Sequence, residues 1–160
     1  MFKSGIGQDS HRFEDEGSIK PLMIGGARIP GCPGLLGNSD ADVVLHAIIN
    51  AISGISGRNI LGKISDDMCL RQGITDSKDY LEKAMESLGN YRISHVSVAL
   101  EGKRPRFEPY IGKIKESLAK LLAIQPSDVG ITATTGEGLT AFGRGEGLQA
   151  FAIVSAEFPD

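Results

Sequence analysis

An apolar segment near the end of the chain constrains the fold more than any other feature of the sequence. Residues Gln149–Phe158 read QAFAIVSAEF, which is much shorter than the run of about 20 apolar residues that a membrane span needs. A run of this length and composition is typical of a strand in the interior of a sheet. It therefore predicts a sheet in which this strand has a neighbour on each side and other elements packed against it.

The remaining hydrophobic periodicities predict further strands and three helices. Strands are expected over Phe2–Asp9, Leu22–Ile24, Ala27–Ile29, His95–Leu100 and Val129–Thr134. Helices are expected from an N-cap in Asn38–Ser39–Asp40 to about Ser53–Gly54, from an Asp76–Ser77 cap to Leu88, and from Pro109 to Leu122. Residues 55–75 are rich in Gly and Asp and are expected to be irregular. This order predicts one α+β domain over residues 1–160, a sandwich of a mixed sheet with helices on one face.

The composition is that of a globular protein with no global attraction to nucleic acid or to anionic membranes. Hydrophobic residues make up 41% of the chain, charged residues 23%, and the net charge is −3, so any anion site must be built locally. Cys32 and Cys69 stand in no CxxC spacing and are expected to be reduced thiols of a cytoplasmic protein. The chain begins without a signal-like apolar run, so we expect no targeting segment before the domain.

Asp9, His11 and His46 are the strongest candidates for metal ligands. Asp9 and His11 stand two positions apart beside a predicted strand, so their side chains can point to one side. His46 lies one turn after Asp42 in a predicted helix, where a histidine is more often a core residue than a ligand. Asp42 can either orient the His46 ring or cap the helix. Three N/O ligands with an open fourth position are typical of catalytic zinc, whereas His95 shows no partner and is interpreted as structural.

A segment rich in threonine and glycine supplies a candidate anion site. Residues 132–139 read TATTGEGL and residues 143–147 read GRGEG, and hydroxyl and glycine-flanked N–H groups can surround a phosphate. The pattern is neither a Walker loop nor a dinucleotide fingerprint. Glu137 can hold magnesium together with phosphate oxygens, or it can be a solvated turn residue. Arg144 and Glu146 can equally form a structural ion pair.

Residues 101–109, EGKRPRFEP, form a short basic loop between a predicted strand and a predicted helix. Its charges suit the phosphates of a nucleotide. A charge run of this kind is usually only a solvated surface, which is the interpretation we keep for the loop taken alone.

Together these motifs resemble one enzyme family. GxDxH from Gly7, NSDxDVxxH from Asn38, RPR from Arg104, ATTxE from Ala133 and GRGEG from Gly143 follow the order and spacing of the 2-C-methyl-D-erythritol 2,4-cyclodiphosphate synthases. The resemblance implies a phosphorus–oxygen lyase of the non-mevalonate isoprenoid pathway. Its reaction converts 4-diphosphocytidyl-2-C-methyl-D-erythritol 2-phosphate to the cyclic diphosphate and releases CMP.

The resemblance also implies roles for single residues. Asp9, His11 and His46 would bind Zn²⁺ or another divalent metal, and Glu137 would hold Mg²⁺ or Mn²⁺ with the diphosphate. Catalytic roles would fall on Thr135 and Asn38. The implied substrate contacts are Asp9, Ser10, His11, Asn38, Ser39, Gly62, Thr134, Thr135, Gly136, Glu137 and Arg144. The implied nucleotide loop comprises Gly102, Lys103, Arg104, Pro105, Arg106 and Phe107.

A homotrimer is implied as well, with an active site at each subunit boundary. The family's GRGEG segment lies near the three-fold axis, where an apolar cavity can hold an isoprenoid diphosphate. Phe142, Arg144 and Glu146 are the residues carried over to that cavity. No nucleic acid and no membrane is expected as a partner.

Three departures from the family pattern bear on activity. Asn38 stands where the family usually has histidine, and it can donate a hydrogen bond but cannot carry a positive charge. Residues 59–62 and 65–69, NILG and SDDMC, differ from the family's usual lid. Gly136 and Gly138 replace a threonine and a lysine. We therefore expect activity with altered affinity, pH response and lid behaviour.

Two other functions stay open on the residues alone. A zinc phosphohydrolase would use metal-bound hydroxide and release inorganic phosphate. A non-catalytic trimer would use the metal structurally and bind an isoprenoid. A structural zinc usually has four protein ligands, and only three are found here, which argues against the second alternative.

Overall fold

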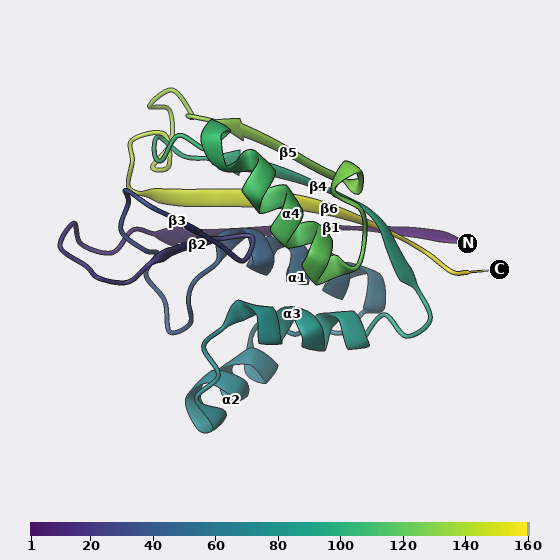
Figure 1. The fold of residues 1–160 in the computed structure, drawn as a ribbon. Helices are drawn as coiled ribbons and strands as arrows, with labels where there is room; N and C mark the ends of the chain where they lie inside the picture. Colours follow the sequence, from purple (N-terminus) through teal and green to yellow (C-terminus); the bar gives the residue numbers. More distant parts are fainter. Residues whose placement is uncertain (160) are drawn as a thin grey trace.

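The computed structural model describes residues 1–159, and a four-stranded mixed sheet lies at its centre (Figure 1). The strands are β1 (Phe2–Arg12), β4 (Arg92–Glu101), β5 (Val129–Thr134) and β6 (Gly147–Glu157), in the order β1–β6–β4–β5. β6 is antiparallel to both of its neighbours, and β4 is parallel to β5. The prediction that the apolar segment near the end of the chain is an interior strand is confirmed.

Helices cover one face of this sheet. α1 (Val43–Ser56) packs on β1 and β6, α4 (Ile111–Leu122) packs on β5, and α3 (Ser77–Glu86) packs on α1. A separate hairpin pairs β2 (Leu22–Ile24) with β3 (Ala27–Ile29), and single turns of 3₁₀-helix span Glu108–Tyr110 and Pro126–Asp128. The predicted α+β domain with a mixed sheet is confirmed.

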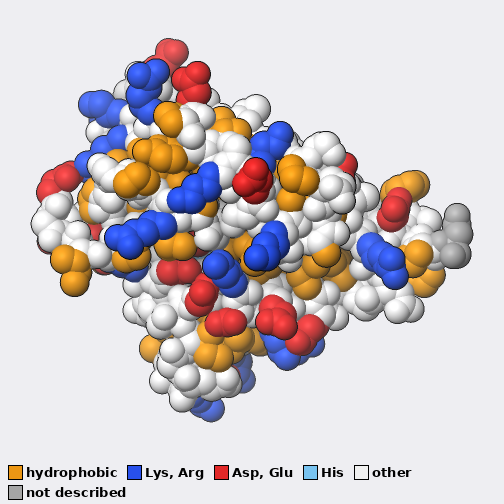
Figure 2. All heavy atoms as spheres, in the orientation of Figure 1, with side chains coloured by type: hydrophobic (Ala, Val, Ile, Leu, Met, Phe, Trp, Pro, Cys, Tyr) orange, Lys and Arg blue, Asp and Glu red, His pale blue; other side chains and the backbone are white. Residues whose placement is uncertain are grey.

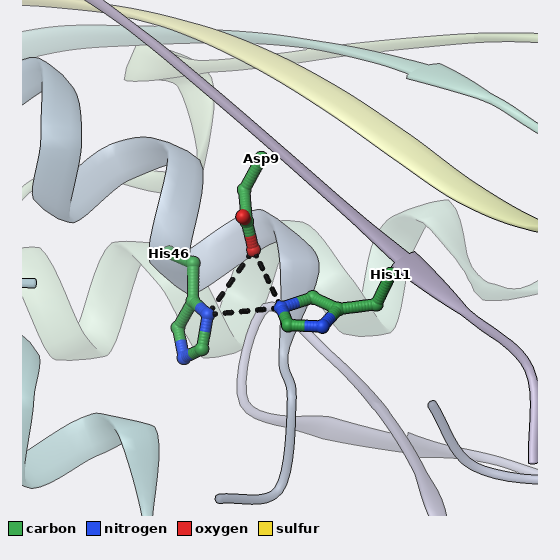
Figure 3. A group of neighbouring side chains, drawn as sticks. All are labelled: Asp9, His11 and His46. Atoms are coloured by element: carbon green, nitrogen blue, oxygen red, sulfur yellow. Dashed lines mark hydrogen bonds and ion pairs between the residues drawn. The ribbon is translucent and has the colours of Figure 1, made fainter. Parts of the chain in front are cut away.

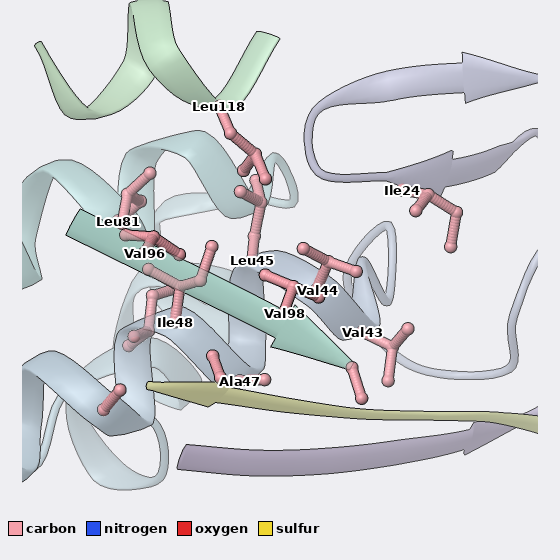
Figure 4. Close-up of a cluster of buried hydrophobic side chains, with 14 of the residues drawn as sticks. Ile24, Val43, Val44, Leu45, Ala47, Ile48, Leu81, Val96, Val98 and Leu118 are labelled. Carbon is pink, nitrogen blue, oxygen red and sulfur yellow. The ribbon is translucent and has the colours of Figure 1, made fainter. Parts of the chain in front are cut away.

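The core surrounds α1 and is completed by the sheet, α3, α4 and the β2–β3 hairpin (Figure 4). α1 is apolar nearly all round because the sheet, α3 and β2 pack on different sides of it. From Leu148 onward β6 alternates, with Ala150, Ala152 and Val154 buried while Phe151 and Ile153 are 44% and 48% exposed. The second face of the sheet is therefore open in the single chain, although it carries large apolar side chains.

The start of α1 differs from the prediction. The N-cap is Asp42, not the Asn38–Ser39–Asp40 segment, and its side chain accepts a hydrogen bond from the N–H of Leu45 at 3.0 Å. The same carboxylate accepts from the N–H groups of Gly25 and Gly26 at 2.8 and 2.7 Å. Asp42 is fully buried, so these three donors replace the water that its charge loses. Its side chain joins the hairpin turn to the helix, whereas the ring of His46 is bonded to Asp9 and Ser77.

The prediction that residues 55–75 are irregular is wrong for its second half. Residues Lys63–Gln72 form α2, with Gly62 as its N-cap and Gly73 as its C-cap. Ser65 is its only buried residue, so there is no wide apolar stripe to reveal the helix in the sequence. The Ser65 hydroxyl accepts from the Gly62 N–H and donates to the Gly62 carbonyl, which caps a start that lacks a usual capping residue.

The surface carries both signs of charge. Figure 2 shows Lys, Arg, Asp and Glu side chains interspersed, with basic ones frequent at the upper left, over the loop end of the sheet. Within residues 1–159, none of the helices has both the length and the apolar character needed to cross a membrane.

Candidate metal centre and adjoining clefts

Asp9, His11 and His46 converge at one point between β1 and α1 (Figure 3). Asp9 and His11 occupy alternate positions of β1 and so point to the same, helix-covered side of the sheet. The strand runs three residues further than predicted, to Arg12. Asp9 Oδ2 lies 2.8 Å from His11 Nε2 and 3.1 Å from His46 Nδ1, and the two ring nitrogens are 3.3 Å apart.

Glycines in β1 bring the strand close to the helix. Gly5 and Gly7 precede Asp9 on the same side of the strand, and a Cβ at either position would meet the backbone of α1. The hydrogen atoms in place of side chains let the strand approach α1 directly. This close approach places the Asp9 carboxylate within reach of His46.

The outer nitrogen of each ring is held by a second group. His11 Nδ1 lies 3.0 Å from the carbonyl oxygen of Leu36, which can only accept, so Nδ1 carries a proton, and in the neutral ring Nε2 keeps its lone pair. His46 Nε2 lies 2.8 Å from the hydroxyl of Ser77 at the start of α3. Both rings therefore turn their inner nitrogens toward the Asp9 carboxylate.

The electrostatics of the cluster favour a bound cation. Burial opposes ionisation of Asp9, but hydrogen bonds and charge from His11 and His46 outweigh it and hold the pKa of Asp9 below its usual value. Burial likewise lowers the pKa of His11, but the hydrogen bond and charge of Asp9 outweigh this effect and leave the pKa raised. The ionised Asp9 carboxylate thus favours a positive charge beside it, and a metal ion that binds must displace any proton on the inner nitrogen of His11.

The donor set fits a divalent metal such as zinc. Ligand atoms about 2.0–2.1 Å from a tetrahedral zinc ion lie roughly 3.3 Å from one another, and the three donor distances in this cluster range from 2.8 to 3.3 Å. One carboxylate oxygen and two imidazole nitrogens are also a combination that zinc accepts. The predicted site is thus assembled by the fold, with three protein donors.

A cleft of about 240 Å³ opens beside these donors. Its other lining residues are Gly37, Asn38, Ser39, Leu61, Ser65, Asp66, Cys69 and Tyr80. Asn38 and Ser39 thus line the same cleft as the three donors. Gly62 is not among the lining residues, and its N–H already donates to Ser65. Ser10 points to the opposite side of β1 from Asp9 and lines a different cleft.

The threonine segment and the basic loop form a second cleft, of about 260 Å³. It is lined by Gly102, Lys103, Pro105, Arg106, Phe107, Glu108, Ile111, Ala133, Thr134 and Thr135. Arg104 instead stacks on Phe13 and pairs with Glu16 at 2.6 Å. The loop is therefore a built part of a cleft and not only a solvated charge run.

Glu137 belongs neither to the group of metal donors nor to the lining of the cleft beside them. It is exposed, lies in the turn after β5, and has positive φ between Gly136 and Gly138, which also have positive φ. A side chain on Gly136 would approach the Cα of Gly143 to 2.9 Å. Glycine therefore suits both the conformation and the space at position 136, where the family pattern has threonine.

Phe142 and Glu146 line a third cleft, of about 260 Å³, beside Ser10, His11 and Arg12. Arg144 pairs with Glu146 at 3.2 Å, and Arg12 pairs with the same carboxylate at 3.4 Å. The ion pair between Arg144 and Glu146 that the sequence left open is thus formed.

Sequence reasoning missed several residues around the donors. Ser77 was predicted only as part of a helix cap, and Leu36 contributes a backbone carbonyl that no side-chain pattern reveals. Cys69 of α2 and Tyr80 of α3 line the cleft beside the donors. The spacing of apolar residues in α3 could have predicted that Tyr80 is buried. Nothing in the local sequence indicated that Cys69 lines the same cleft.

Comparison with known proteins agrees with this geometry. Residues 2–157 match the YgbB family. The chain is 47% identical over 156 residues to the 2-C-methyl-D-erythritol 2,4-cyclodiphosphate synthase of Chlamydia caviae, covering 97% of this chain and 89% of that protein. A solved structure of a synthase of the same name aligns with a TM-score of 0.83 at 32% identity, over 97% of this chain and 100% of that one. A CDP-bound form aligns with a TM-score of 0.80 at 30% identity over the same shares.

The family match over residues 2–157 and the identity to the curated relative both cover nearly the whole chain. This chain therefore belongs to the YgbB family.

Proposed function

We propose that this chain is a 2-C-methyl-D-erythritol 2,4-cyclodiphosphate synthase. It converts 4-diphosphocytidyl-2-C-methyl-D-erythritol 2-phosphate to the cyclic diphosphate and releases CMP. The observation that carries the proposal is the three-donor cluster of Asp9, His11 and His46 beside a cleft, in a chain 47% identical to a synthase of this name.

The reaction needs alignment more than it needs a protein nucleophile. An oxygen of the substrate's 2-phosphate forms a bond to the β-phosphorus. The bond from that phosphorus to the oxygen bridging toward the α-phosphorus breaks, and the electron pair leaves with CMP. Because attacking and leaving groups belong to one molecule, holding them in line supplies much of the rate.

The proposal assigns zinc or another divalent metal to Asp9, His11 and His46, and Mg²⁺ or Mn²⁺ to Glu137 with the diphosphate. When bound, these cations orient the phosphates and disperse the charge that develops in the transition state. The Asp9 carboxylate and the inward nitrogens of the two rings hold the first ion in place.

The remaining roles follow from the two clefts. Thr134 and Thr135 donate hydroxyl hydrogen bonds to phosphate oxygens, with Gly136 allowing close backbone approach. Asn38 and Ser39 hold the methylerythritol end beside the metal donors, and Asn38 does so without a charge. The loop from Gly102 to Phe107 receives the cytidine, a role supported by the CDP in the related solved structure.

Assembly as a homotrimer completes the site. On one chain the metal donors and the threonine segment line two different clefts, so a substrate that spans both needs a second subunit. The open sheet face also carries Ile6, Phe151 and Ile153, with Ile6 paired to Ile153 across β1 and β6. A contiguous exposed apolar surface of this kind is typical of a subunit interface.

The trimer proposal predicts that Ile153→Asp separates the subunits. A carboxylate buried at the interface would lose its hydration without gaining a partner. We expect light scattering after size-exclusion chromatography to give the mass of three chains for the wild type and one for the variant. Ile19→Asp is the matched control, because Ile19 is 99% exposed and lies outside the sheet. A trimeric Ile153→Asp protein would place the interface elsewhere.

The cleft at Phe142 and Glu146 is proposed to form part of a central cavity, with Arg144 beside it, that accepts an isoprenoid diphosphate. A cytoplasmic location belongs to the same proposal and is supported by two free cysteines.

The activity is tested with purified protein, Zn²⁺, Mg²⁺ and the diphosphocytidyl substrate. We expect CMP and cyclic diphosphate in equal amounts, measured by ³¹P NMR and chromatography. Release of inorganic phosphate in place of the cyclic product would favour the phosphohydrolase, and absence of all products from the metal-loaded trimer would refute catalysis of this reaction.

A further inference from the structure

Behind the metal donors lies a buried serine from a different helix. Ser77 is the first residue of α3 and is fully buried, and its hydroxyl oxygen is 2.8 Å from Nε2 of His46. That nitrogen is the one that faces away from Asp9 and His11. Ser77 therefore contacts the only part of the His46 ring that a bound metal would leave available for a hydrogen bond.

Asp40 holds Ser77 through two hydrogen bonds. The N–H of Ser77 donates to Oδ2 of Asp40 at 3.1 Å, and the Ser77 hydroxyl donates to Oδ1. The N–H of Asp40 in turn donates to the carbonyl of Thr75 at 2.9 Å. The N–H of Asp42 donates to Asp40 Oδ1 at 3.2 Å. The loop before α1 is thus joined to the start of α3 next to the metal donors.

Counting protons fixes the direction of these bonds. A serine hydroxyl has one proton and two lone pairs, and an ionised carboxylate only accepts. The Ser77 proton is directed to Asp40, so a lone pair of Ser77 is directed to His46. Nε2 of His46 must then carry the proton, and in the neutral ring Nδ1 keeps its lone pair. That lone pair faces Asp9 Oδ2 at 3.1 Å.

We infer that Asp40 and Ser77 form a positioning pair that holds His46 in the tautomer and ring orientation required for metal binding. Neither residue contacts the three atoms that would bind the metal, which are Asp9 Oδ2, His11 Nε2 and His46 Nδ1. The pair therefore acts only through His46. The arrangement parallels His11, whose outer nitrogen donates to Leu36. The inference rests on the proposed metal site but does not depend on the reaction.

Two substitutions disturb the pair in different ways. Ser77→Ala removes the acceptor of the Nε2 proton and frees the ring. Asp40→Asn replaces one acceptor oxygen by an NH₂ group. Whichever way the amide lies, its NH₂ group faces a donor, either the Ser77 N–H or the Ser77 hydroxyl together with the Asp42 N–H, so residue 40 no longer fixes the direction of the Ser77 proton. Loss of such outer partners typically lowers metal affinity by about 10–100-fold.

The matched control is Ser53→Ala. Ser53 is a buried serine of α1, like His46, and its hydroxyl accepts from the N–H of Ile60 at 3.4 Å, away from the metal donors. This variant shows how much stability is lost when a buried hydroxyl is removed from the same helix and the metal donors are left unchanged.

The experiment measures metal affinity and histidine tautomer in the full-length protein. Co²⁺ is titrated into metal-free wild type, Ser77→Ala, Asp40→Asn and Ser53→Ala, with visible absorption bands recorded, and Zn²⁺ affinity is obtained by competition. Two-bond ¹H–¹⁵N spectra of the metal-free proteins report which nitrogen of His46 is protonated. Thermal midpoints of the metal-free forms report stability alone.

We expect an Nε2–H signature for His46 in wild type and Ser53→Ala. Both pair variants should lose this signature and bind Co²⁺ and Zn²⁺ about 10–100-fold more weakly, with altered Co²⁺ bands. An Nδ1–H signature in the wild type, or wild-type affinity in Ser77→Ala and Asp40→Asn, would overturn the inference. If one variant does not fold, the other decides. A wild type that binds metal as expected but yields no cyclic product would refute the proposed reaction and leave the positioning pair standing.

Discussion

Replacing His46 with alanine is expected to remove the metal from the purified protein and to abolish the synthase reaction. Only Asp9 and His11 would remain as donors, and two protein ligands hold zinc far more weakly than three. A bound cation supplies several kcal/mol of charge stabilisation in the transition state, and about 4 kcal/mol corresponds to roughly 10³ in rate. We therefore expect kcat/KM to fall by about 10³-fold or more, with metal content measured by inductively coupled plasma mass spectrometry.

The chain offers its own control for this experiment. His95 is an exposed histidine of β4 outside the donor cluster, so His95→Ala should keep wild-type metal content and activity. A His46→Ala protein that still carries one metal ion per chain would show that the ligand assignment is wrong. Loss of metal in both variants would contradict the assignment, because His95 is not part of the donor cluster.

Much of this centre was predictable because its rules are local. Alternation along a strand places Asp9 and His11 on one side, whatever the rest of the fold does. His46 lies beside them only because α1 packs on β1. The residues alone did not predict this packing, and the three-ligand site was inferred from the resemblance to a family. Ser77 was beyond local reasoning, because its partners Asp40 and His46 are distant in the sequence and no spacing rule links them.

The error at the start of α1 arises because two neighbouring polar side chains are both suited to the same role. Asp40 and Asp42 both satisfy the requirements of an N-cap, and the choice was made by tertiary contacts, since Asp42 also receives two N–H groups of the hairpin turn. Asp40 serves Ser77 instead. α2 escaped prediction because it lies on the surface with one buried residue, so its periodicity is weak.

Substituting Gly7 with alanine should destabilise the fold by about 3 kcal/mol, near the upper end of the usual cost of overpacking. A Cβ there would lie 1.9 Å from the carbonyl oxygen of Ala47 and 2.4 Å from the amide nitrogen of Ala51. Both atoms belong to the backbone of α1, so no side-chain rotation can relieve the clash. The free energy of unfolding is measured by urea denaturation of the metal-free protein.

The same substitution should weaken metal binding, because β1 carries Asp9 and His11 while α1 carries His46. A strand pushed away from the helix separates donors that now lie about 3 Å apart. Gly112→Ala in α4 is the matched control: its Cβ would have no heavy atom within 4 Å beyond its chain neighbours and its own helix backbone. Alanine favours a helix over glycine by up to about 1 kcal/mol, so this variant should be slightly stabilised and bind metal normally. Unchanged stability and metal affinity in Gly7→Ala would mean that strand and helix are not packed backbone to backbone, and the explanation of how the donors meet would fail with it.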